Sequence, residues 1–233
     1  MTDPGPSTAN LSGKAAQTRS LILATGLRLL RERGYDGTTM RAIAKEAGVS
    51  VGNAYHYFDS KDFLVQAFYD ELAGEHRTAS ATVLGRERDL AARLRGVSRA
   101  WVVVAQPYHG FAGTFFRTAA EPTSPLSPFS KESAPAREAV IGLFREVLDG
   151  SDAKPDPQLR SELPELLWLW HMGIVLFWVH DASAGNRKTY ELIDRSSALV
   201  ARLVQLSRLR VLRPATNEVL DLIRTLRAAD QAG

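Results

Sequence analysis

The sequence predicts an all-α fold, with a small three-helix unit at the N-terminus followed by a larger helical body. Apolar residues recur every three or four positions along most of the chain, which is the period of a helix. No stretch of useful length shows the alternating pattern of a strand. Glycine, proline, serine and threonine fall between the apolar stretches, where helices begin and end. A chain of 233 residues is long enough for one or two domains with a sizeable core.

The composition excludes several classes of protein. The chain has no cysteine, so it can form no disulfide and carry no thiolate chemistry, and we expect a cytoplasmic protein. The longest apolar run, 166–179, is too short to span a bilayer and predicts a buried helix, so no membrane partner is expected. Residues 14–61 include eight basic and four acidic side chains, a local net charge of +4. A basic segment on a near-neutral body favours a nucleic-acid-binding module.

The first elements are expected in this order. Residues 1–16 are rich in Pro, Gly, Ser, Thr and Ala and predict a flexible arm. A first helix is expected over 17–33, and Gly34 is its C-terminal stop. Its apolar stripe consists of Ile22, Leu23, Leu27 and Leu30.

Two short helices joined by a glycine follow, and they predict a helix-turn-helix over about 39–58. Thr39 is the expected N-cap of a helix over 40–47. Gly48 makes the turn, because glycine adopts a positive φ without steric cost. Ser50 is the expected N-cap of the second helix, over 51–58, which in this motif enters the major groove of DNA.

The larger body is predicted to be helical throughout. Ser60 is the N-cap of a helix over 61–76, and Pro164 lies in the first turn of an apolar helix that ends near residue 180. Loops are expected over 121–135, which contains four prolines, and over 150–157. The remaining predicted helices cover 90–104, 111–120, 137–148, 187–209 and 217–228.

Residues at and beside the second helix of the motif suit contacts with DNA. Gly52 allows close approach of the backbone, Val51 can contact a thymine methyl group, and Asn53 can bond a base edge or a phosphate. Arg41 can reach a guanine or a phosphate, while Thr39 and Lys61 are expected to hold phosphates at the two edges of the groove. Two alternatives remain open, namely that Tyr57 belongs to the core and that His56 is merely solvated. The candidate DNA-binding residues are Thr39, Arg41, Ser50, Val51, Gly52, Asn53, Tyr55, His56, Tyr57 and Lys61.

The segment 18–64 resembles the DNA-binding domain of the TetR family of one-component bacterial transcriptional regulators. Two positions depart from the family pattern: Tyr57 stands where many members have histidine, and Ala54 replaces a common leucine. The first change alters the donors offered to phosphate, and the second loosens the packing slightly. The matching residues are Ile22, Leu23, Leu27, Gly34, Tyr35, Thr38, Thr39, Arg41, Ile43, Ala44, Ala47, Gly48, Val49, Ser50, Gly52, Tyr55, Phe58, Lys61 and Leu64.

The resemblance implies a DNA-binding domain over 17–61 and a ligand-binding and dimerisation domain over 62–233. It implies a repressor that leaves a palindromic double-stranded operator when a small molecule binds. It also implies a homodimer formed through the helices at about 163–180 and 187–209. Two half-sites of a palindrome, read by two recognition helices, suit such a dimer. A monomer with the apolar helix as its core is the alternative.

The effector is expected to be apolar or aromatic, because aromatic and polar residues lie on otherwise apolar helices of the body. His171 is the sharpest candidate, being a titratable group within an apolar helix. Each candidate could equally be a core residue or a satisfied buried group. The candidate effector-binding residues are Trp101, His109, Phe115, Phe116, Arg117, Trp170, His171 and Phe177.

Other functions find less support in the sequence. The five histidines, at 56, 76, 109, 171 and 180, show no catalytic or metal-binding spacing. No phosphate-binding glycine loop is present, so we expect no enzyme activity, no metal and no cofactor. A regulator without an effector, an activator, and an interaction scaffold with a vestigial DNA-binding unit remain alternatives.

Overall fold

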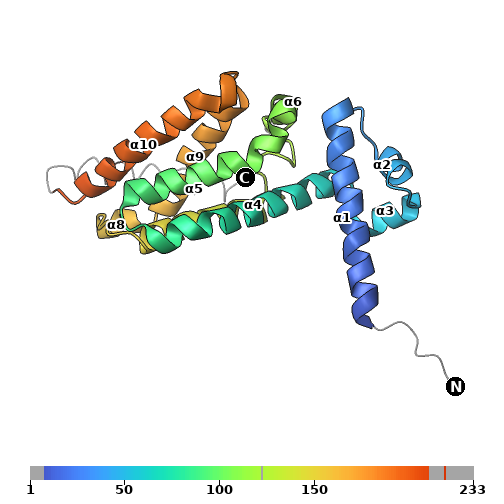
Figure 1. The fold of residues 1–233 in the computed structure, drawn as a ribbon, viewed down its shortest axis with the longest axis horizontal. Coiled ribbons are helices and arrows are strands. Elements are labelled where there is room, and N and C mark those ends of the chain that lie inside the picture. The colour runs from blue at the N-terminus through green and yellow to red at the C-terminus, as the bar shows by residue number, and fades with distance from the viewer. Residues whose placement is uncertain (1–7, 122, 210–217, 219–233) are drawn as a thin grey trace. The chain divides into compact units, whose positions relative to one another are not determined.

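The structure is a computed structural model that describes residues 8–121, 123–209 and 218, and the described part is built from helices alone (Figure 1). This confirms the predicted all-α fold. The helices in chain order are α1 (Thr8–Arg33), α2 (Met40–Glu46), α3 (Val51–Tyr57), α4 (Lys61–Arg86), α5 (Leu90–Ala105), η1 (Gln106–Tyr108), α6 (His109–Ala119), α7 (Ala134–Asp149), α8 (Pro157–Arg160), α9 (Leu163–Val179), η2 (Ala184–Asn186) and α10 (Arg187–Leu206).

The chain divides into two compact units. The head unit comprises Met1–Leu72 and Gly110–Ala136, and the body unit comprises Ala73–His109 and Arg137–Gly233. Helix α4 contributes its first turns to the head unit and its remaining turns to the body unit. The sequence predicts a boundary between the DNA-binding and ligand-binding domains after residue 61, whereas the two compact units divide α4 after Leu72. The functional boundary at residue 61 stays a prediction.

The core of the head unit forms where α1, α2 and α3 meet the start of α4. Ile22, Ile43 and Leu64 are completely buried there. Gly26 of α1 lies so close to α4 that an added Cβ atom would be 2.6 Å from the Leu64 side chain. Small residues at such contacts let helices approach closely, and Figure 1 shows α2 and α3 together beside α1. An ion pair of 2.7 Å between Arg28 and Glu46 adds a surface link from α1 to α2.

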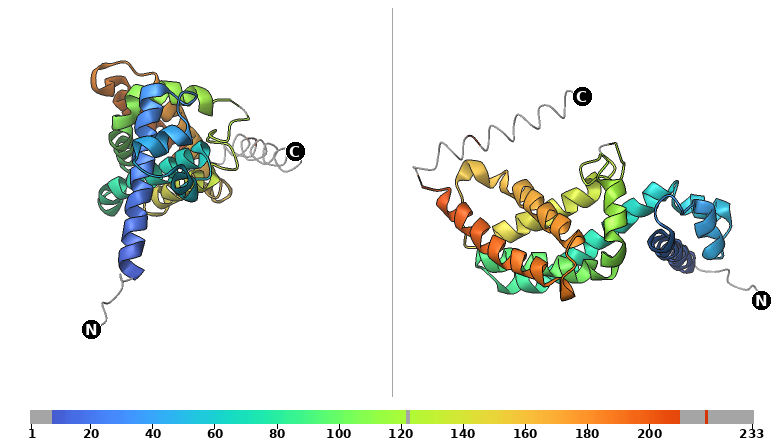
Figure 2. Two further views of the ribbon diagram at one scale, coloured as in Figure 1. Left: turned by 90° about the vertical axis from the view of Figure 1, so that its right-hand side faces the viewer. Right: turned by 90° about the horizontal axis from the view of Figure 1, so that it is seen from above.

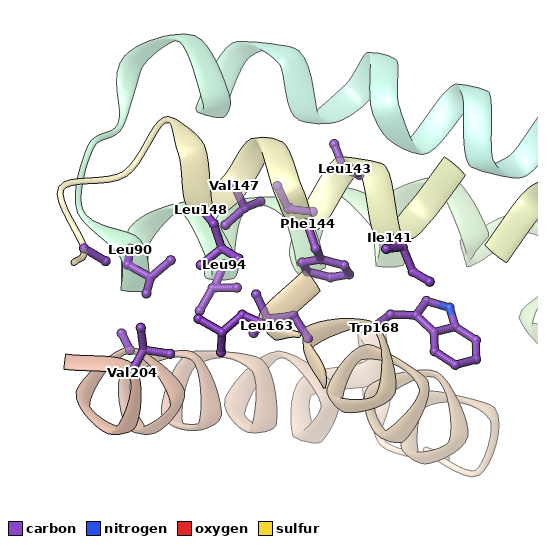
Figure 3. Close-up of a cluster of buried hydrophobic side chains, with 14 of the residues drawn as sticks. Leu90, Leu94, Ile141, Leu143, Phe144, Val147, Leu148, Leu163, Trp168 and Val204 are labelled. Atoms are coloured by element: carbon purple, nitrogen blue, oxygen red, sulfur yellow. The ribbon is translucent and has the colours of Figure 1, made fainter. Parts of the chain in front are cut away.

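The body unit is a helical bundle in which α5 and α10 run side by side (Figures 1 and 2). Apolar side chains from α5, α7, α9 and α10 meet in its centre (Figure 3). Burial of these groups away from water is the main favourable term in folding the unit. The largest contributors are Leu90, Leu94, Leu143, Phe144, Val147, Leu163, Leu167 and Trp168.

A buried arginine closes one end of this bundle. Arg93 of α5 is only 2% exposed, and its guanidinium group donates to four backbone carbonyl oxygens. The acceptors belong to Leu84 and Glu87 at the end of α4, and to Glu146 and Val147 near the end of α7, at 2.6–2.8 Å. Carbonyls in the last turn of a helix lack partners within it, so one planar cation satisfies two helix ends at once.

A buried carboxylate organises the start of α10. Asp181 accepts hydrogen bonds from the backbone N–H and hydroxyl groups of both Ser183 and Thr189, at 2.6–2.9 Å. Burial by itself raises the pKa of Asp181, but these four bonds outweigh it and lower the pKa. Asn186 between them has a φ of 53° and donates to the Asp181 carbonyl. The corner between α9 and α10 is thus held in one conformation.

Several boundaries differ from the sequence predictions. Helix α1 already begins at Thr8, so the flexible arm predicted over 1–16 is wrong for 8–16, because extending a helix costs less than nucleating one. Helix α4 continues past 76 to Arg86, because Val83 and Leu84 beyond the expected end pack against the core. The helix predicted over 217–228 lies outside the described residues, apart from residue 218, which is helical.

Replacing Arg93 by lysine should destabilise the body unit by roughly 3 kcal/mol, because an ammonium group cannot reach four carbonyls arranged around a planar fork. Urea unfolding followed by circular dichroism measures the change. Arg86→Lys, at the exposed end of α4, is the matched control and should change the free energy of unfolding by less than about 0.5 kcal/mol. Equal stability of the two variants would show that the carbonyl bonds of Arg93 contribute nothing.

Candidate nucleic-acid interface and effector site

The turn between α2 and α3 is built as the sequence predicts. Gly48 has a φ of +68°, and the N–H of the next residue, Val49, donates back to the Ala44 carbonyl at 3.0 Å. A residue with a side chain would be strained at that φ. Ser50 then accepts from the Asn53 N–H at 3.1 Å and begins α3. The glycine and the cap together set the direction in which α3 leaves the turn.

The two predicted hydroxyl caps are confirmed, and they orient both helices of the motif. Thr39 accepts from the Ala42 N–H at 3.2 Å, as Ser50 does for Asn53. The remaining N–H groups at the start of a helix stay available to an anion. Both helix starts therefore remain able to meet phosphate groups, as the sequence analysis expects.

Helix α3 has one buried face and one exposed face. Ala54 and Phe58 are buried against the head unit, whereas Val51 is 39% and Tyr55 is 47% exposed. Large apolar and aromatic groups on the exposed face of a short helix have no packing role within the protein. Val51 and Tyr55 are therefore accessible from solvent, as the expected contacts with DNA require.

Gly52 on this exposed face has no packing reason to be glycine. A Cβ atom added there would meet nothing within 4 Å, and its backbone is helical, with no positive φ. Glycine in a helix costs about 1 kcal/mol relative to alanine. Packing within the described residues therefore does not explain the absence of a side chain at Gly52.

The other candidates on the motif have different surroundings. Arg41 is exposed and forms no hydrogen bond or ion pair with the residues that the structure describes. His56 is exposed, and its ring meets the half-buried ring of Tyr57 edge-on at 5.2 Å. Because Tyr57 is half-buried, it can pack against the core or contact a phosphate, and both interpretations stay open.

Lys61 has a structural role that the sequence analysis did not foresee. Its Nζ donates to the carbonyl oxygens of Tyr35 and of Thr38, the latter at 3.0 Å, and lies 3.6 Å from the centre of the Tyr35 ring. The neighbouring Asp62 accepts a hydrogen bond from the Tyr35 hydroxyl. Burial lowers the pKa of Lys61 and raises that of Asp62. Two of the three ammonium donors are thus used within the protein, and one is left for a phosphate.

The candidate effector residues separate into two groups. Phe115, Phe116 and Arg117 lie on α6 in the head unit, where the Phe115 ring meets Tyr69 edge-on at 5.7 Å. The other five, Trp101, His109, Trp170, His171 and Phe177, lie in the body unit. Of these, Phe177 is 40% exposed and so does not belong to the interior.

The aromatic residues in the interior of the body unit meet at Trp101. Its ring contacts His171 edge-on at 5.2 Å and Trp178 edge-on at 5.0 Å. Trp170 instead packs against Phe144, at 6.3 Å. The structure therefore brings the rings of Trp101 and His171 into contact.

His109 is already bonded within the protein. Its Nε2 lies 2.8 Å from the Trp178 carbonyl oxygen, which can only accept, so this nitrogen carries the hydrogen. The Asn186 amide nitrogen lies 3.2 Å from the same atom. The His109 ring therefore joins the start of α6 to the end of α9. Only its Nδ1 atom remains available to bind an effector.

His76 is the main residue that the sequence analysis missed. It stacks on His171 with ring centroids 5.6 Å apart, and its Nε2 lies 3.0 Å from the Val97 carbonyl. Burial lowers the pKa of His76 to about 4. Burial, together with the neighbouring His76, lowers the pKa of His171 well below its usual value. Both rings are therefore neutral at pH 7. The sequence predicts His76 at the end of a helix, where side chains are usually exposed, but α4 continues to Arg86 and His76 is completely buried.

The described residues contain no group of three or more side chains arranged to hold a metal ion. Among the same residues, no helix is both long and apolar enough to cross a bilayer.

Comparisons with known proteins match both parts of the chain. The family model described as "Bacterial regulatory proteins, tetR family" matches residues 22–68. The model described as "Tetracyclin repressor-like, C-terminal domain" matches residues 93–225. Together they cover the helix-turn-helix and most of the body unit.

Individual relatives agree with these models. The HTH-type transcriptional repressor KstR2 of Rhodococcus jostii is 37% identical over 91 residues, which are 37% of this chain but only 44% of that protein. An HTH-type transcriptional regulator from the dhlA 5′ region of Xanthobacter autotrophicus is 30% identical over 146 residues, covering 52% of this chain and 72% of that protein. The crystal structure of the TetR transcriptional regulator from Nitrosomonas europaea superposes with a TM-score of 0.62 over 79% of this chain and 98% of that one. Its sequence identity of 17% supports a likeness of fold.

Two glycines of the motif should respond oppositely to the same substitution. Gly48→Ala should destabilise the protein by about 1 kcal/mol, because alanine is strained at a φ of +68°. Gly52→Ala should stabilise it by up to about 1 kcal/mol, because alanine is the better helix former and the space is open. Thermal unfolding of both variants beside the wild type measures the difference. A loss of stability in Gly52→Ala would contradict the claim that the glycine serves no packing role.

Proposed function

Because this chain belongs to the TetR family of bacterial transcriptional regulators, we propose that it is a repressor that reads a palindromic operator and is released by a small effector. The observation that carries the proposal is the exposed face of α3. On this face Gly52, between Val51 and Asn53, is a glycine that packing within the protein does not require. The name of KstR2 as a repressor supports this sign of regulation. An activator, or a regulator without an effector, is the alternative that the same residues allow.

Each candidate group on the motif, whether exposed or half-buried, has a role that its chemistry suits. Val51 reaches a thymine methyl group, Asn53 a base edge, and Arg41 a guanine or a phosphate. Tyr55 and His56 donate to phosphates that fix the position of the protein on the duplex. Lys61 contributes its remaining donor at the edge of the groove, and Thr39 and Ser50 offer helix starts to the backbone. This action takes place in the cytoplasm, where a bacterial operator lies.

The homodimer that reads two half-sites forms through α9 and α10. On α9, Leu169 and Leu176 are exposed at a spacing of two helical turns. Gly173 between them is also exposed, and a Cβ atom added there would meet nothing within 4 Å. On α10, Leu199 and Leu203 are exposed one turn apart. Apolar stripes of this kind, with a glycine that allows close approach, suit a helix-to-helix interface with a second copy.

The effector acts through two states of the dimer. It binds in the body unit, beside Trp101 and His171, and favours the state in which the two recognition helices no longer fit successive grooves. Helix α4 belongs to both units and is the element through which this change reaches the head. The effector shifts the equilibrium only by its difference in affinity for the two states.

The reading of DNA is tested by selecting bound sequences from a random duplex library with the purified full-length protein. We expect a palindrome whose half-sites are about one helical turn apart. Arg41→Ala and Gly52→Ala should each weaken binding to the selected duplex by about tenfold or more in fluorescence anisotropy. Arg145→Ala, on the exposed side of α7, is the charge-matched control and should bind as the wild type does. Recovery of no motif would overturn the proposed function.

The dimer is tested by placing a charge in the apolar stripe. Leu203→Asp should convert the protein to a monomer in size-exclusion chromatography with light scattering, because a carboxylate is costly to bury in an apolar interface. Its helical circular dichroism should be unchanged, since Leu203 is 57% exposed in the monomer. Val103→Asp, an equally exposed apolar site on α5, should remain dimeric. A dimer that survives Leu203→Asp would contradict the assignment of α10 to the interface.

A further inference from the structure

The head unit is assembled from two separate stretches of the chain. The stretch Met1–Leu72 supplies α1, α2, α3 and the first turns of α4, and the stretch Gly110–Ala136 supplies most of α6 and the segment that follows it. The chain therefore passes between the head unit and the body unit at three points, after Leu72, before Gly110 and after Ala136. If the second stretch left the first, α4 alone would connect Met1–Leu72 to the body unit. The contacts between the two stretches thus decide how many connections the head has.

The segment 123–133 of the second stretch, here called the strap, is folded into consecutive turns. The N–H groups of Ser124, Ser127 and Ser130 each donate to the carbonyl three residues earlier, at 3.0 Å. Proline rings at Pro125 and Pro128 restrict the backbone between these turns. The strap therefore has a defined shape and offers its carbonyl groups in fixed positions.

Gln66 of α4 binds the strap with its side-chain amide. Its Nε2 donates to the Pro125 carbonyl at 2.7 Å and to the Ser133 hydroxyl oxygen at 3.2 Å. The Ser130 hydroxyl donates to the same Pro125 carbonyl at 2.8 Å, so that oxygen accepts two hydrogen bonds, which is its full capacity. Ser133 is only 2% exposed. One side chain of α4 thus joins two distant points of the strap.

Tyr69, three residues further along α4, makes a second connection. Its hydroxyl donates to the Leu126 carbonyl at 3.0 Å, and its ring meets that of Phe115 on α6 edge-on at 5.7 Å. Burial raises the pKa of the Tyr69 hydroxyl, so this group keeps its hydrogen at neutral pH and remains a donor. Residues three apart lie on the same face of a helix, so Gln66 and Tyr69 act on the strap together.

These connections can be weakened without unfolding the head unit. A single hydrogen bond between uncharged groups contributes modestly to stability. The apolar core of the head depends on other residues, among them Ile22, Ile43 and Leu64, which are completely buried. The hold of α4 on the strap is therefore separable from the fold of the helix-turn-helix.

We propose that Gln66 and Tyr69 are positioning residues for the reading of DNA. They hold the strap on α4 and so keep the head connected to the body by three stretches of chain instead of one. A head connected in this way has less freedom to rotate or shift, and less entropy is lost when two heads dock at a fixed separation. The dimer is thereby made selective for one spacing of half-sites. The inference rests on the proposed function in taking a palindrome read by a dimer as the activity.

The first test measures how strictly the full-length protein requires the half-site spacing of its selected duplex. One or two base pairs inserted between the half-sites displace and rotate one half-site relative to the other. The wild type should bind the lengthened duplexes at least tenfold more weakly in fluorescence anisotropy. The double variant Gln66→Met/Tyr69→Phe keeps side chains of similar size but removes the donors, and it should lose less than threefold. Equal losses in the two proteins would overturn the proposal.

Two controls separate spacing from damage to the helix-turn-helix. Gln158→Met/Tyr190→Phe makes the same two changes in the body unit and should discriminate between the duplexes as the wild type does. A duplex with a single half-site should bind the wild type and Gln66→Met/Tyr69→Phe equally, and weaker binding by the variant would refute a role in spacing. If the double variant does not fold, Tyr69→Phe alone, which keeps the ring, should show an intermediate loss of discrimination.

A measurement without DNA distinguishes failure of this inference from failure of the proposed function. Spin labels at Asp59→Cys in the head and Arg145→Cys on α7, in protein diluted with unlabelled subunits, report a distance within one protomer. The wild type should give a narrow distribution, and Gln66→Met/Tyr69→Phe a broader one. Broadening without selection of any palindrome would support the hold of the strap and overturn the proposed function. An unchanged distribution would refute the strap even where operator binding is normal.

Discussion

The loop between α1 and α2 is joined to the start of α4 by the hydrogen bonds of one ammonium group. Lys61 begins α4, and its Nζ donates to the carbonyls of Tyr35 and Thr38 while lying against the Tyr35 ring. Asp62 accepts from the Tyr35 hydroxyl and doubles the connection. The loop between α1 and α2 is thereby fixed to the first turn of α4. Helices α2 and α3 lie between these two points along the chain.

The same helix that begins at Lys61 carries His76 and Ser80 in the body unit. A ligand bound in the body unit would favour the arrangement of α4 to which it binds more tightly. Coupling between sites requires only such a difference in affinity. Arg93 and Asp181 hold other helix ends of the body unit through their hydrogen bonds.

The local features of the fold could be predicted, and the long-range polar contacts could not. Gly48, Thr39 and Ser50 act within a few residues of themselves, so their turn and caps follow from the sequence alone. Lys61 resembles an exposed phosphate ligand until its acceptors, some 23–26 residues away, are known. His76 was missed because polar residues after it suggested the end of a helix that in fact continues to Arg86. The flexible arm was wrong for 8–16 for a related reason, since polar composition does not by itself end a helix.

A dimer that reads a palindrome must hold two copies of the head at the spacing of successive major grooves. The chain has no cysteine, so a single Asp59→Cys substitution beside α3 allows one spin label per protomer. Pulsed electron–electron resonance on the full-length protein with its selected duplex should give one narrow distance, consistent with recognition helices about 34–36 Å apart. The absence of any dipolar signal, or a distance incompatible with successive grooves, would contradict the account.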